Sequence, residues 1–337
     1  MVVISRVWWY NNHVIKRDHI ITKGMVLNMK KTFRSIAVIL VSALCLSAAS
    51  CSSGEKNITV VAREQGSGTR EAFDKVVSDG THFLEEKDAD GKTVYNTTNS
   101  AVQQTKTGTV LSTVSSDKNA IGYVSLGSLN DSVKVVSVDG VMPSEDSVLD
   151  GSYRIQRPFV VMTNANVTLT PLTADFMSYL KSDAAEIFAN EAGCIFLKDA
   201  AKRANEGSTP IKVEAYTKSS ALPSGKIIVR GSTSMEKFIN AAAKGYAELY
   251  GVEAQEIFDI QLEGSSVGRK AVEDDKNGNV IGLSSASVKK DGINSFNACL
   301  DAVAVIVHKD NTTVSDLTLG ELYDIFSGKV TKFSELG

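Results

Sequence analysis

The sequence predicts an α/β fold with mainly parallel sheets, and two observations lead to it. Short apolar segments rich in β-branched residues alternate with segments of helical periodicity along most of the chain. This alternation is the pattern of repeated strand–helix units. The 337 residues, of which 43% are hydrophobic, are enough for one large domain or two of ordinary size.

The first half of the body opens with a strand and a helix. A polar stretch with Asp and Gly at residues 81–98 then indicates a loop or a hairpin. The strands that we expect in this half are 58–62, 120–124, 133–138 and 158–163. The helices that we expect are 70–77, 101–115, 172–180 and 184–191.

A linker is predicted at residues 201–225, because this stretch is rich in Ser, Lys, Gly and Pro. The alternation resumes after it. The expected strands are 226–230, 258–263, 280–283 and 302–307. The expected helices are 235–250, 267–274 and 317–326. Thr318 followed by Glu321 predicts a capping box at the start of the last helix.

An export signal precedes the body. Basic residues after Met29 lead into an apolar run that is too short for an ordinary membrane span. Cys51 follows small residues and resembles the lipidated cysteine of a bacterial lipobox, although Ala48 stands where leucine is expected. We therefore expect a leader over residues 1–51 and a lipid anchor on Cys51, with an ordinary cleaved signal or an uncleaved anchor as alternatives. Residues 1–28 fit no signal region, so Met29 is the expected true start, and an unusually long n-region is the alternative.

Composition narrows the classes of function. The net charge of −3 gives no basic surplus for binding nucleic acid. Cys194 and Cys299 are the only cysteines of the body, and we expect buried free thiols, with a disulfide as the alternative. The histidines are isolated, and no Cys/His spacing indicates a metal site. We predict no metal, no cofactor and no catalytic residue.

Three strand-to-helix junctions share one chemistry, because small residues and hydroxyls stand where each helix begins. They lie at residues 63–69, 231–234 and 263–268. The free N–H groups and the dipole of a helix start attract anions, and Arg63 adds a full positive charge. A simple helix cap is the alternative for any one loop, but three such loops in one exported chain favour an anion-binding site.

Hydrolytic chemistry has little support. None of the loops has the Gly-Lys-Ser/Thr ending of a nucleotide-binding P-loop. Ser266 lies at the centre of a G-x-S-x-G pattern, but His308 is the only histidine after it and no triad can be read. An enzyme such as a phosphatase is therefore disfavoured against a binding protein.

Several segments together resemble the phosphate-binding proteins of bacterial ABC importers. The strongest are REQGSGTREAF at 63–73 and GSTSMEKF at 231–238. Further similar stretches lie at 120–129, 138–159, 300–311 and 317–337. The resemblance covers most of residues 57–200 and 226–337. It implies a two-lobed fold like that of the type II periplasmic binding proteins, with a ligand cleft and hinge strands between the lobes.

The order of these segments differs from that of the family, in which the GSTS segment comes first and the GSGTR segment follows. We therefore predict a circular permutation, in which residues 201–225 join the usual C-terminus to the usual N-terminus. One lobe would comprise 57–156 with 307–337, and the other 157–306. A swapped dimer of half-chains and a chain that lacks a further GSGTR half are alternatives; we expect a monomer.

The resemblance also implies a ligand shell for phosphate. The matching positions are Arg63, Ser67, Gly68 and Thr69 in one lobe, and Thr233, Ser234, the backbone N–H of Met235, Ser265 and Ser285 in the other. Some members have an aspartate at the position of Ser285, which accepts the proton of hydrogen phosphate and repels sulfate. Ser285 can accept a hydrogen bond but repels nothing, so discrimination against sulfate is less secure than anion binding itself.

The implied function is that of a lipid-anchored protein on the extracytoplasmic face of the cell membrane. It would capture inorganic phosphate between lobes that close about a hinge and deliver the anion to the permease of an ABC transporter. Another tetrahedral oxyanion such as sulfate, and a non-transport role as a phosphate sensor or adhesin, are the alternatives.

Overall fold

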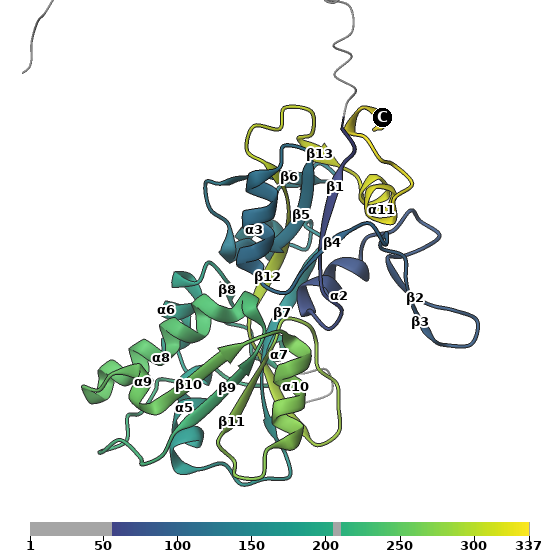
Figure 1. Ribbon diagram of the computed structural model, residues 1–337. Helices are drawn as coiled ribbons and strands as arrows, with labels where there is room; N and C mark the ends of the chain where they lie inside the picture. The colour runs from purple at the N-terminus through teal and green to yellow at the C-terminus, as the bar shows by residue number, and fades with distance from the viewer. Residues whose placement is uncertain (1–55, 205–209, 337) are drawn as a thin grey trace, which may run out of the picture. The chain divides into compact units, whose positions relative to one another are not determined.

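The structure is a computed structural model and describes residues 56–204 and 210–336. Strands and helices alternate along the described chain (Figure 1), which confirms the predicted α/β fold. The predicted leader with Cys51 lies outside the described residues. Within them, no helix is long and apolar enough to cross a membrane.

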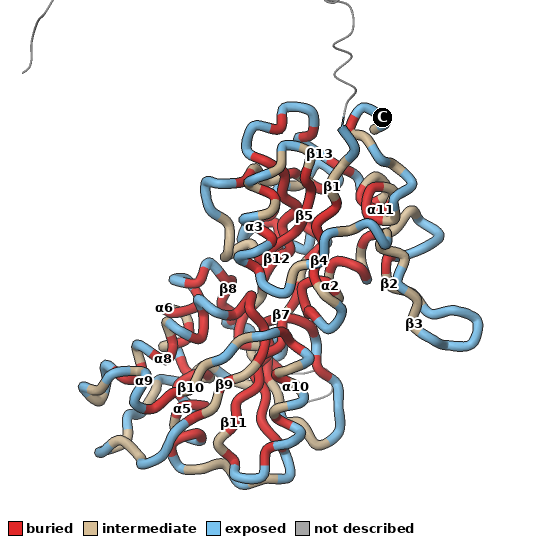
Figure 2. Tube along the Cα trace, in the orientation of Figure 1, coloured by how far each residue is buried: buried red, intermediate tan, exposed pale blue. Residues whose placement is uncertain are grey.

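Two main hydrophobic cores organise the body, and Figure 2 shows that their buried residues follow the strands. One core draws on residues 60–155, Ile195 and residues 302–333. The other draws on residues 159–299. We call the parts of the chain around them the first lobe and the second lobe. The predicted lobe boundaries remain a prediction, which this division of the cores supports.

The first lobe contains the amino-terminal strand and the carboxy-terminal helix. Its strands are β1 (Thr59–Arg63), β2 (Glu85–Lys87), β3 (Thr93–Tyr95), β4 (Val102–Gln104), β5 (Ala120–Ser125), β6 (Val133–Val138) and β13 (Asp316–Leu317). Its helices are α2 (Gly68–Asp74), α3 (Thr107–Ser116), α4 (Glu145–Leu149) and α11 (Leu319–Ser327), with 3-10 turns η1 (Leu126–Ser128) and η3 (Phe333–Glu335).

The second lobe contains the middle of the chain. Its strands are β8 (Ile195–Phe196), β9 (Ile227–Gly231), β10 (Phe258–Leu262) and β11 (Val280–Ser284). Its helices are α5 (Pro171–Lys181), α6 (Ala184–Glu191), α7 (Ala200–Arg203), α8 (Glu236–Tyr250), α9 (Ala254–Ile257) and α10 (Ser265–Asp274), with the 3-10 turn η2 (Thr233–Met235).

Two long strands, β7 (Gln156–Asn164) and β12 (Ile293–His308), run antiparallel to each other and connect the lobes. β12 pairs with β5 and β6 in the first lobe and with β8 in the second. The expected parallel pairing occurs within the lobes, where β1 pairs with β4 and β5, and β9 pairs with β10 and β11. β12 contributes residues to both cores, and β7 follows Ile155 of the first core and enters the second. These two strands can therefore act as a hinge.

Two predicted elements differ from the structure. The helix predicted at 101–115 is wrong at its start, because Val102–Gln104 forms β4 and pairs with β1, and α3 begins only at Thr107. The strand predicted at 302–307 begins at Ile293, since polar residues interrupt the apolar pattern of its first half. The predicted capping box of Thr318 and Glu321 is confirmed.

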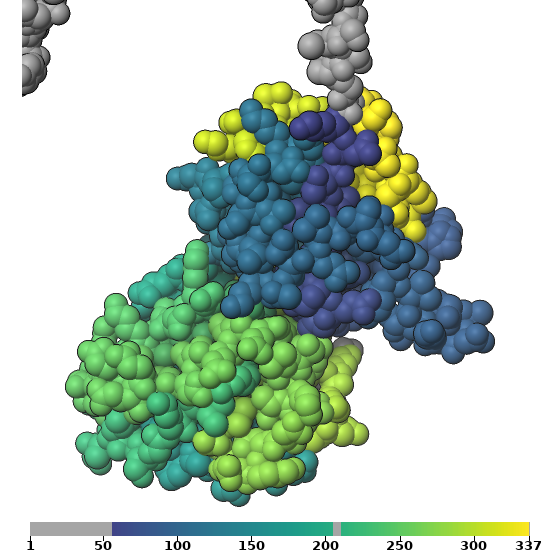
Figure 3. Space-filling model, viewed as in Figure 1, coloured from purple at the N-terminus to yellow at the C-terminus, as the bar shows by residue number. Residues whose placement is uncertain are grey.

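The two ends of the described body lie side by side. The Ile58 N–H donates to the Thr331 carbonyl over 2.7 Å, and in Figure 3 the two ends of the described chain lie on the same part of the surface. This adjacency is expected if a family chain was opened at this point, because the two residues would then have been near neighbours in sequence.

The described second part of the linker is tied to the second lobe by one carboxylate. Asp175 Oδ2 accepts from the hydroxyls of Tyr216 (2.7 Å), Tyr246 (2.6 Å) and Tyr250 (3.0 Å), and Oδ1 accepts from Ser219 (2.9 Å). Burial raises the pKa of Asp175, but these hydrogen bonds outweigh it and the pKa is lowered. Two of the donors lie on the linker and two on α8, so Asp175 on α5 joins three segments.

Candidate functional site

The first predicted loop connects β1 to α2 in the first lobe. Ser67 is the N-cap of α2, and its side chain accepts from the Arg70 N–H. Gly66 has φ +89, a left-handed conformation that favours glycine. Arg63, Ser67 and Thr69 are almost completely buried. The strand–loop–helix arrangement expected here is therefore present.

The Arg63 guanidinium is held along two of its edges. Nε and Nη2 donate to the two carboxylate oxygens of Glu64 over 2.9 and 3.0 Å. The same nitrogens also reach the carbonyls of Gln104 (3.1 Å) and Thr105 (3.2 Å). Nη1 makes only a long contact of 3.4 Å with Thr107 Oγ1. Nη1 is thus the part of the guanidinium that is least occupied by protein.

A buried network behind the loop fixes Arg63. Arg70 Nη1 donates to the Arg63 carbonyl (3.0 Å) and its Nε to Asp74 Oδ2 (2.9 Å), while the Tyr123 hydroxyl accepts from the Arg63 N–H (3.1 Å). Burial raises the pKa of Asp74 to about 6, although the charge of Arg70 acts in the opposite direction. Burial also raises the pKa of the Tyr123 hydroxyl. The backbone and side chain of Arg63 are therefore both positioned before any ligand arrives.

The second predicted loop connects β9 to α8 in the second lobe. Ser232 caps the turn by accepting from the Ser234 N–H. Thr233, Ser234 and Met235 are buried, and the Met235 side chain lies in the core of the second lobe. The Met235 N–H, which the resemblance assigns to the ligand, donates to the Ser232 carbonyl over 3.1 Å. To bind an anion as well, the Met235 N–H would have to donate to two acceptors at once.

The third predicted loop connects β10 to α10, and it joins the second loop through three serines. Ser232 Oγ donates to Ser285 Oγ over 2.8 Å, and Ser265 Oγ lies 3.4 Å from Ser285 Oγ and accepts from the Ser285 N–H. Ser265 and Ser285 are fully buried. We call Ser232, Ser265 and Ser285 the serine cluster. No carboxylate takes part in these hydrogen bonds, as the sequence led us to expect at position 285.

The loops of the two lobes meet. Thr69 Oγ1 lies 2.8 Å from Ser234 Oγ, and Thr107 Oγ1 lies 3.2 Å from Thr233 Oγ1. A Cβ placed on Gly68 would lie 2.6 Å from the hydroxyls of both Ser265 and Ser285. Thr69 of the first lobe thus lies against Ser234 of the second, and Gly68 lies against Ser265 and Ser285. The Ser67 hydroxyl bonds only within its own loop, and Thr233 is reached through Thr107.

Sequence reasoning missed two residues of this arrangement. Thr107, the first residue of α3, contacts both Arg63 and Thr233, and the only signal for it is a further hydroxyl-rich helix start at residues 105–109. Ser232 lies in the GSTS segment at 231–238, but the sequence did not predict that it belongs to the site. Ser266 makes no hydrogen bond with a histidine or an acid in the described chain, and its N–H donates to Gly66. A nucleophilic role for it has no support.

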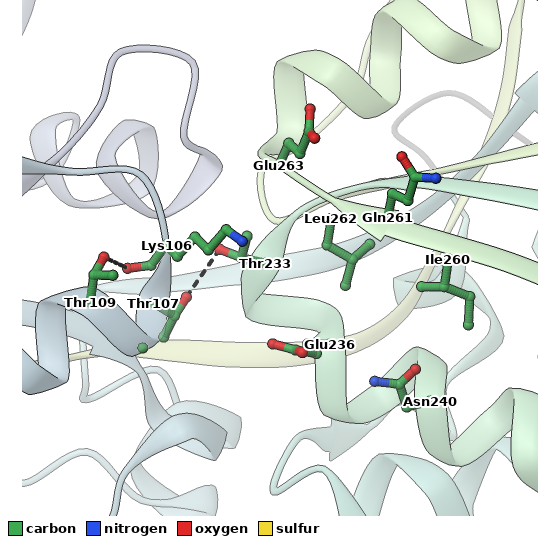
Figure 4. A pocket seen from close by; sticks show the side chains of 11 residues that line it. Lys106, Thr107, Thr109, Thr233, Glu236, Asn240, Ile260, Gln261, Leu262 and Glu263 are labelled. Atoms are coloured by element: carbon green, nitrogen blue, oxygen red, sulfur yellow. Dashed lines mark hydrogen bonds between the residues drawn. The ribbon is translucent and has the colours of Figure 1, made fainter.

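A cavity of about 520 Å³ opens beside the loops, between α3 of the first lobe and β10 and α8 of the second. Figure 4 shows Lys106 extended toward Thr233, with Glu236 and Glu263 on the opposite wall. Thr107 and Thr233 belong both to this cavity and to the contact between the lobes. Among the described residues, no group of His, Cys, Asp and Glu side chains could hold a metal ion.

Comparisons with known proteins give a consistent result. A family model described as a PBP superfamily domain matches residues 49–184 and 217–337. The phosphate-binding protein PstS 2 of Streptococcus pneumoniae is 36% identical over 293 residues, which cover 86% of this chain and 91% of that protein. PstS 2 of Streptococcus agalactiae is 34% identical over 291 residues, or 85% and 90%.

A solved structure also matches. A phosphate-binding protein of a phosphate ABC transporter from Streptococcus pneumoniae is 34% identical and superposes with a TM-score of 0.60, over 83% of this chain and 100% of that one. The phosphate-binding protein PstS of Bacillus subtilis, by contrast, is 32% identical over only 130 residues, or 38% of each chain.

Proposed function

Since this chain belongs to the family of the phosphate-binding proteins, which have a PBP superfamily domain, we propose that it binds inorganic phosphate outside the cytoplasm for an ABC importer. The observation that carries the proposal is the meeting of the Arg63 loop with the hydroxyls of Thr233, Ser234 and the serine cluster. A doubly charged anion loses much hydration energy on burial, so many donors must converge on it. This junction supplies them without a metal.

The proposed shell draws donors from both lobes. From the first lobe we propose Arg63 Nη1, the hydroxyls of Ser67 and Thr69, and the Gly68 N–H. From the second we propose the hydroxyls of Thr233, Ser234, Ser265 and Ser285, and the Met235 N–H contributes only if its bond to the Ser232 carbonyl is shared. Binding would replace the hydroxyl–hydroxyl bonds between the lobes by bonds to the anion. The closed form would then be stabilised through the ligand.

Release and transfer require no covalent step. The hinge strands β7 and β12 would let the lobes part and give the anion to a permease. Within the described residues, the hydroxyls that meet between the two lobes bond to one another and none of them bonds to a histidine or a carboxylate, so we propose a binding protein and no enzyme. A chromogenic phosphate ester should therefore remain intact when incubated with the protein.

Two further parts of the proposal concern the membrane anchor and the order of the family's segments along the chain. We propose that Cys51 is lipidated, which mass spectrometry of the membrane-extracted protein would test. We also propose that the chain is a circular permutation of the family's usual order. The hydrogen bond from the Ile58 N–H to the Thr331 carbonyl, which brings the two ends of the described body together, supports this order.

Calorimetric titration of the purified full-length protein, stripped of phosphate, tests the binding function. We expect tight binding of phosphate with one site per monomer at pH 5.5 and pH 8. Sulfate binding of similar strength would widen the ligand class to tetrahedral oxyanions. A folded monomer that binds neither anion would refute the function.

A further inference from the structure

The two thiols of the body lie together in the second lobe. β8 pairs antiparallel with β12, with Phe196 opposite Cys299. Cys194 directly precedes β8, and Cys194 and Cys299 belong to the same hydrophobic core. Cys194 is 6% exposed and Cys299 is fully buried, and both are free. The Cys194 thiol donates to the Ala192 carbonyl over 3.9 Å, and it lies within electrostatic range of Cys299.

Arg157 lies beside Cys194 and has a buried N–H without an acceptor in the described chain. Its Nε and Nη2 donate to Asp301 Oδ2 over 3.0 and 2.8 Å, whereas the buried Nη1 has no partner. Cys194 is within electrostatic range of this guanidinium. A buried donor left unpaired is costly, and a thiolate is an acceptor that would satisfy it.

Arg203 stands in the same relation to Cys299. Its Nη1 and Nη2 donate to the carbonyls of Leu197 (3.4 Å) and Lys181 (3.0 Å), and its buried Nε has no partner in the described chain. Arg203 is fully buried, and Cys299 lies within electrostatic range of its guanidinium. Burial raises the pKa of the Cys299 thiol well above its ordinary value, whereas the charge of Arg203 acts in the opposite direction. Two incompletely bonded arginines thus flank the pair of thiols.

We propose that Cys194 and Cys299 are a redox-active pair that an external disulfide oxidises to an intrachain disulfide. The Cys194 thiolate, which is the more accessible, attacks one sulfur of the donor RSSR, so that a mixed disulfide forms and RS⁻ leaves. Cys299 then loses its proton and attacks the Cys194 sulfur, and a second RS⁻ leaves. The two protons of the protein thiols pass to the two RS⁻, so the donor is reduced to two RSH.

Cys194 is also next to a contact between the lobes. A Cβ on Gly193 would lie 2.9 Å from the Gly127 Cα, and Lys237 Nζ donates to the Gly127 carbonyl over 2.5 Å. A disulfide would therefore restrain the part of the second lobe that touches the first. It would also close a loop of about 100 residues, which restricts the unfolded chain and stabilises the fold.

Peptide mapping of the full-length protein tests the pair directly. The folded, reduced protein is incubated with oxidised glutathione, its remaining thiols are alkylated, and peptides are analysed without reduction. We expect a Cys194–Cys299 cross-link and no retained glutathione at either position. The midpoint of thermal unfolding should rise by roughly 5–10 °C and return on reduction. The leader cysteines, Cys45 and Cys51, are mapped separately.

Two matched variants test the order of the steps. Cys299→Ala should retain one glutathione on Cys194, while Cys194→Ala should leave Cys299 reduced. A folded wild-type protein whose thiols stay reduced, a cross-link that forms only in urea, or glutathione on Cys299 in Cys194→Ala would each overturn the proposal. The wild-type map is decisive even if a variant fails to fold, and none of these outcomes bears on phosphate binding.

Discussion

The two lobes differ in what they offer a ligand at the proposed anion site. The first lobe offers a full charge, Arg63, whose orientation is fixed by Glu64 and by backbone carbonyls. The second lobe offers hydroxyls and N–H groups, with the serine cluster at its centre. The difference suggests a division of labour, in which one lobe attracts an anion and the other sets which anion is accepted.

Removing the positive charge of Arg63 should have the largest effect on phosphate affinity. Arg63→Ala deletes the cation and leaves the Glu64 carboxylate, so we expect phosphate affinity to fall by about 100-fold or more. Titration calorimetry measures the loss. Arg154→Ala is the matched control, because Arg154 is an exposed arginine of the same lobe. Equal affinity in both variants would show that the first lobe does not supply the attraction.

Preventing the approach of the lobes should have the next largest effect. Gly68→Ala places a methyl group 2.6 Å from the hydroxyls of Ser265 and Ser285, so the loops must separate. We expect affinity to fall roughly 10- to 100-fold by calorimetry, and the thermal midpoint to fall by several degrees because of the added contact. Gly108→Ala, where an added Cβ meets nothing within 4 Å, should bind normally. Normal binding by Gly68→Ala would mean that the ligand does not lie between these loops.

Adding a carboxylate to the second lobe should sharpen selectivity. Ser285→Asp could accept the proton of hydrogen phosphate but would repel sulfate, so the phosphate-to-sulfate affinity ratio should rise by roughly 10-fold or more. Competition between the two anions at pH 7 measures it. Ser287→Asp places the same charge on an exposed neighbour and should leave the ratio unchanged. If the phosphate-to-sulfate affinity ratio of Ser285→Asp equalled that of the wild-type protein, the serine cluster would not determine selectivity.

The smallest expected effect concerns Asp74, which belongs to the buried network that fixes Arg63. The pKa of Asp74 is raised by burial to about 6 in the folded protein from its ordinary value of 3.8, so the folded state binds more protons than the unfolded chain between these pH values. The contribution of Asp74 to stability is therefore fully present below pH 4 and is lost as the pH rises through 6. Asp74→Asn should flatten the pH dependence of the thermal midpoint in this window. A profile unchanged by Asp74→Asn would contradict the assignment.

The sequence predicts the three loops well, because each is local: a strand, small residues and a helix start follow one another. It could not predict that Thr107 joins Arg63 to Thr233, since that contact links three distant segments. Nor could periodicity predict β4, which is a strand because it pairs with β1. The early start of β12 was missed for a related reason, because pairing with β7 compensates for its polar residues.

A crystal structure of the protein with bound phosphate tests the central claim most directly. The account predicts one tetrahedral anion between the lobes, within hydrogen-bonding distance of Arg63 Nη1, Thr69 Oγ1, Ser234 Oγ and Ser265 Oγ. An anion found instead in the cavity beside Lys106, with the hydroxyls of the two lobes still bonded to one another, would contradict it.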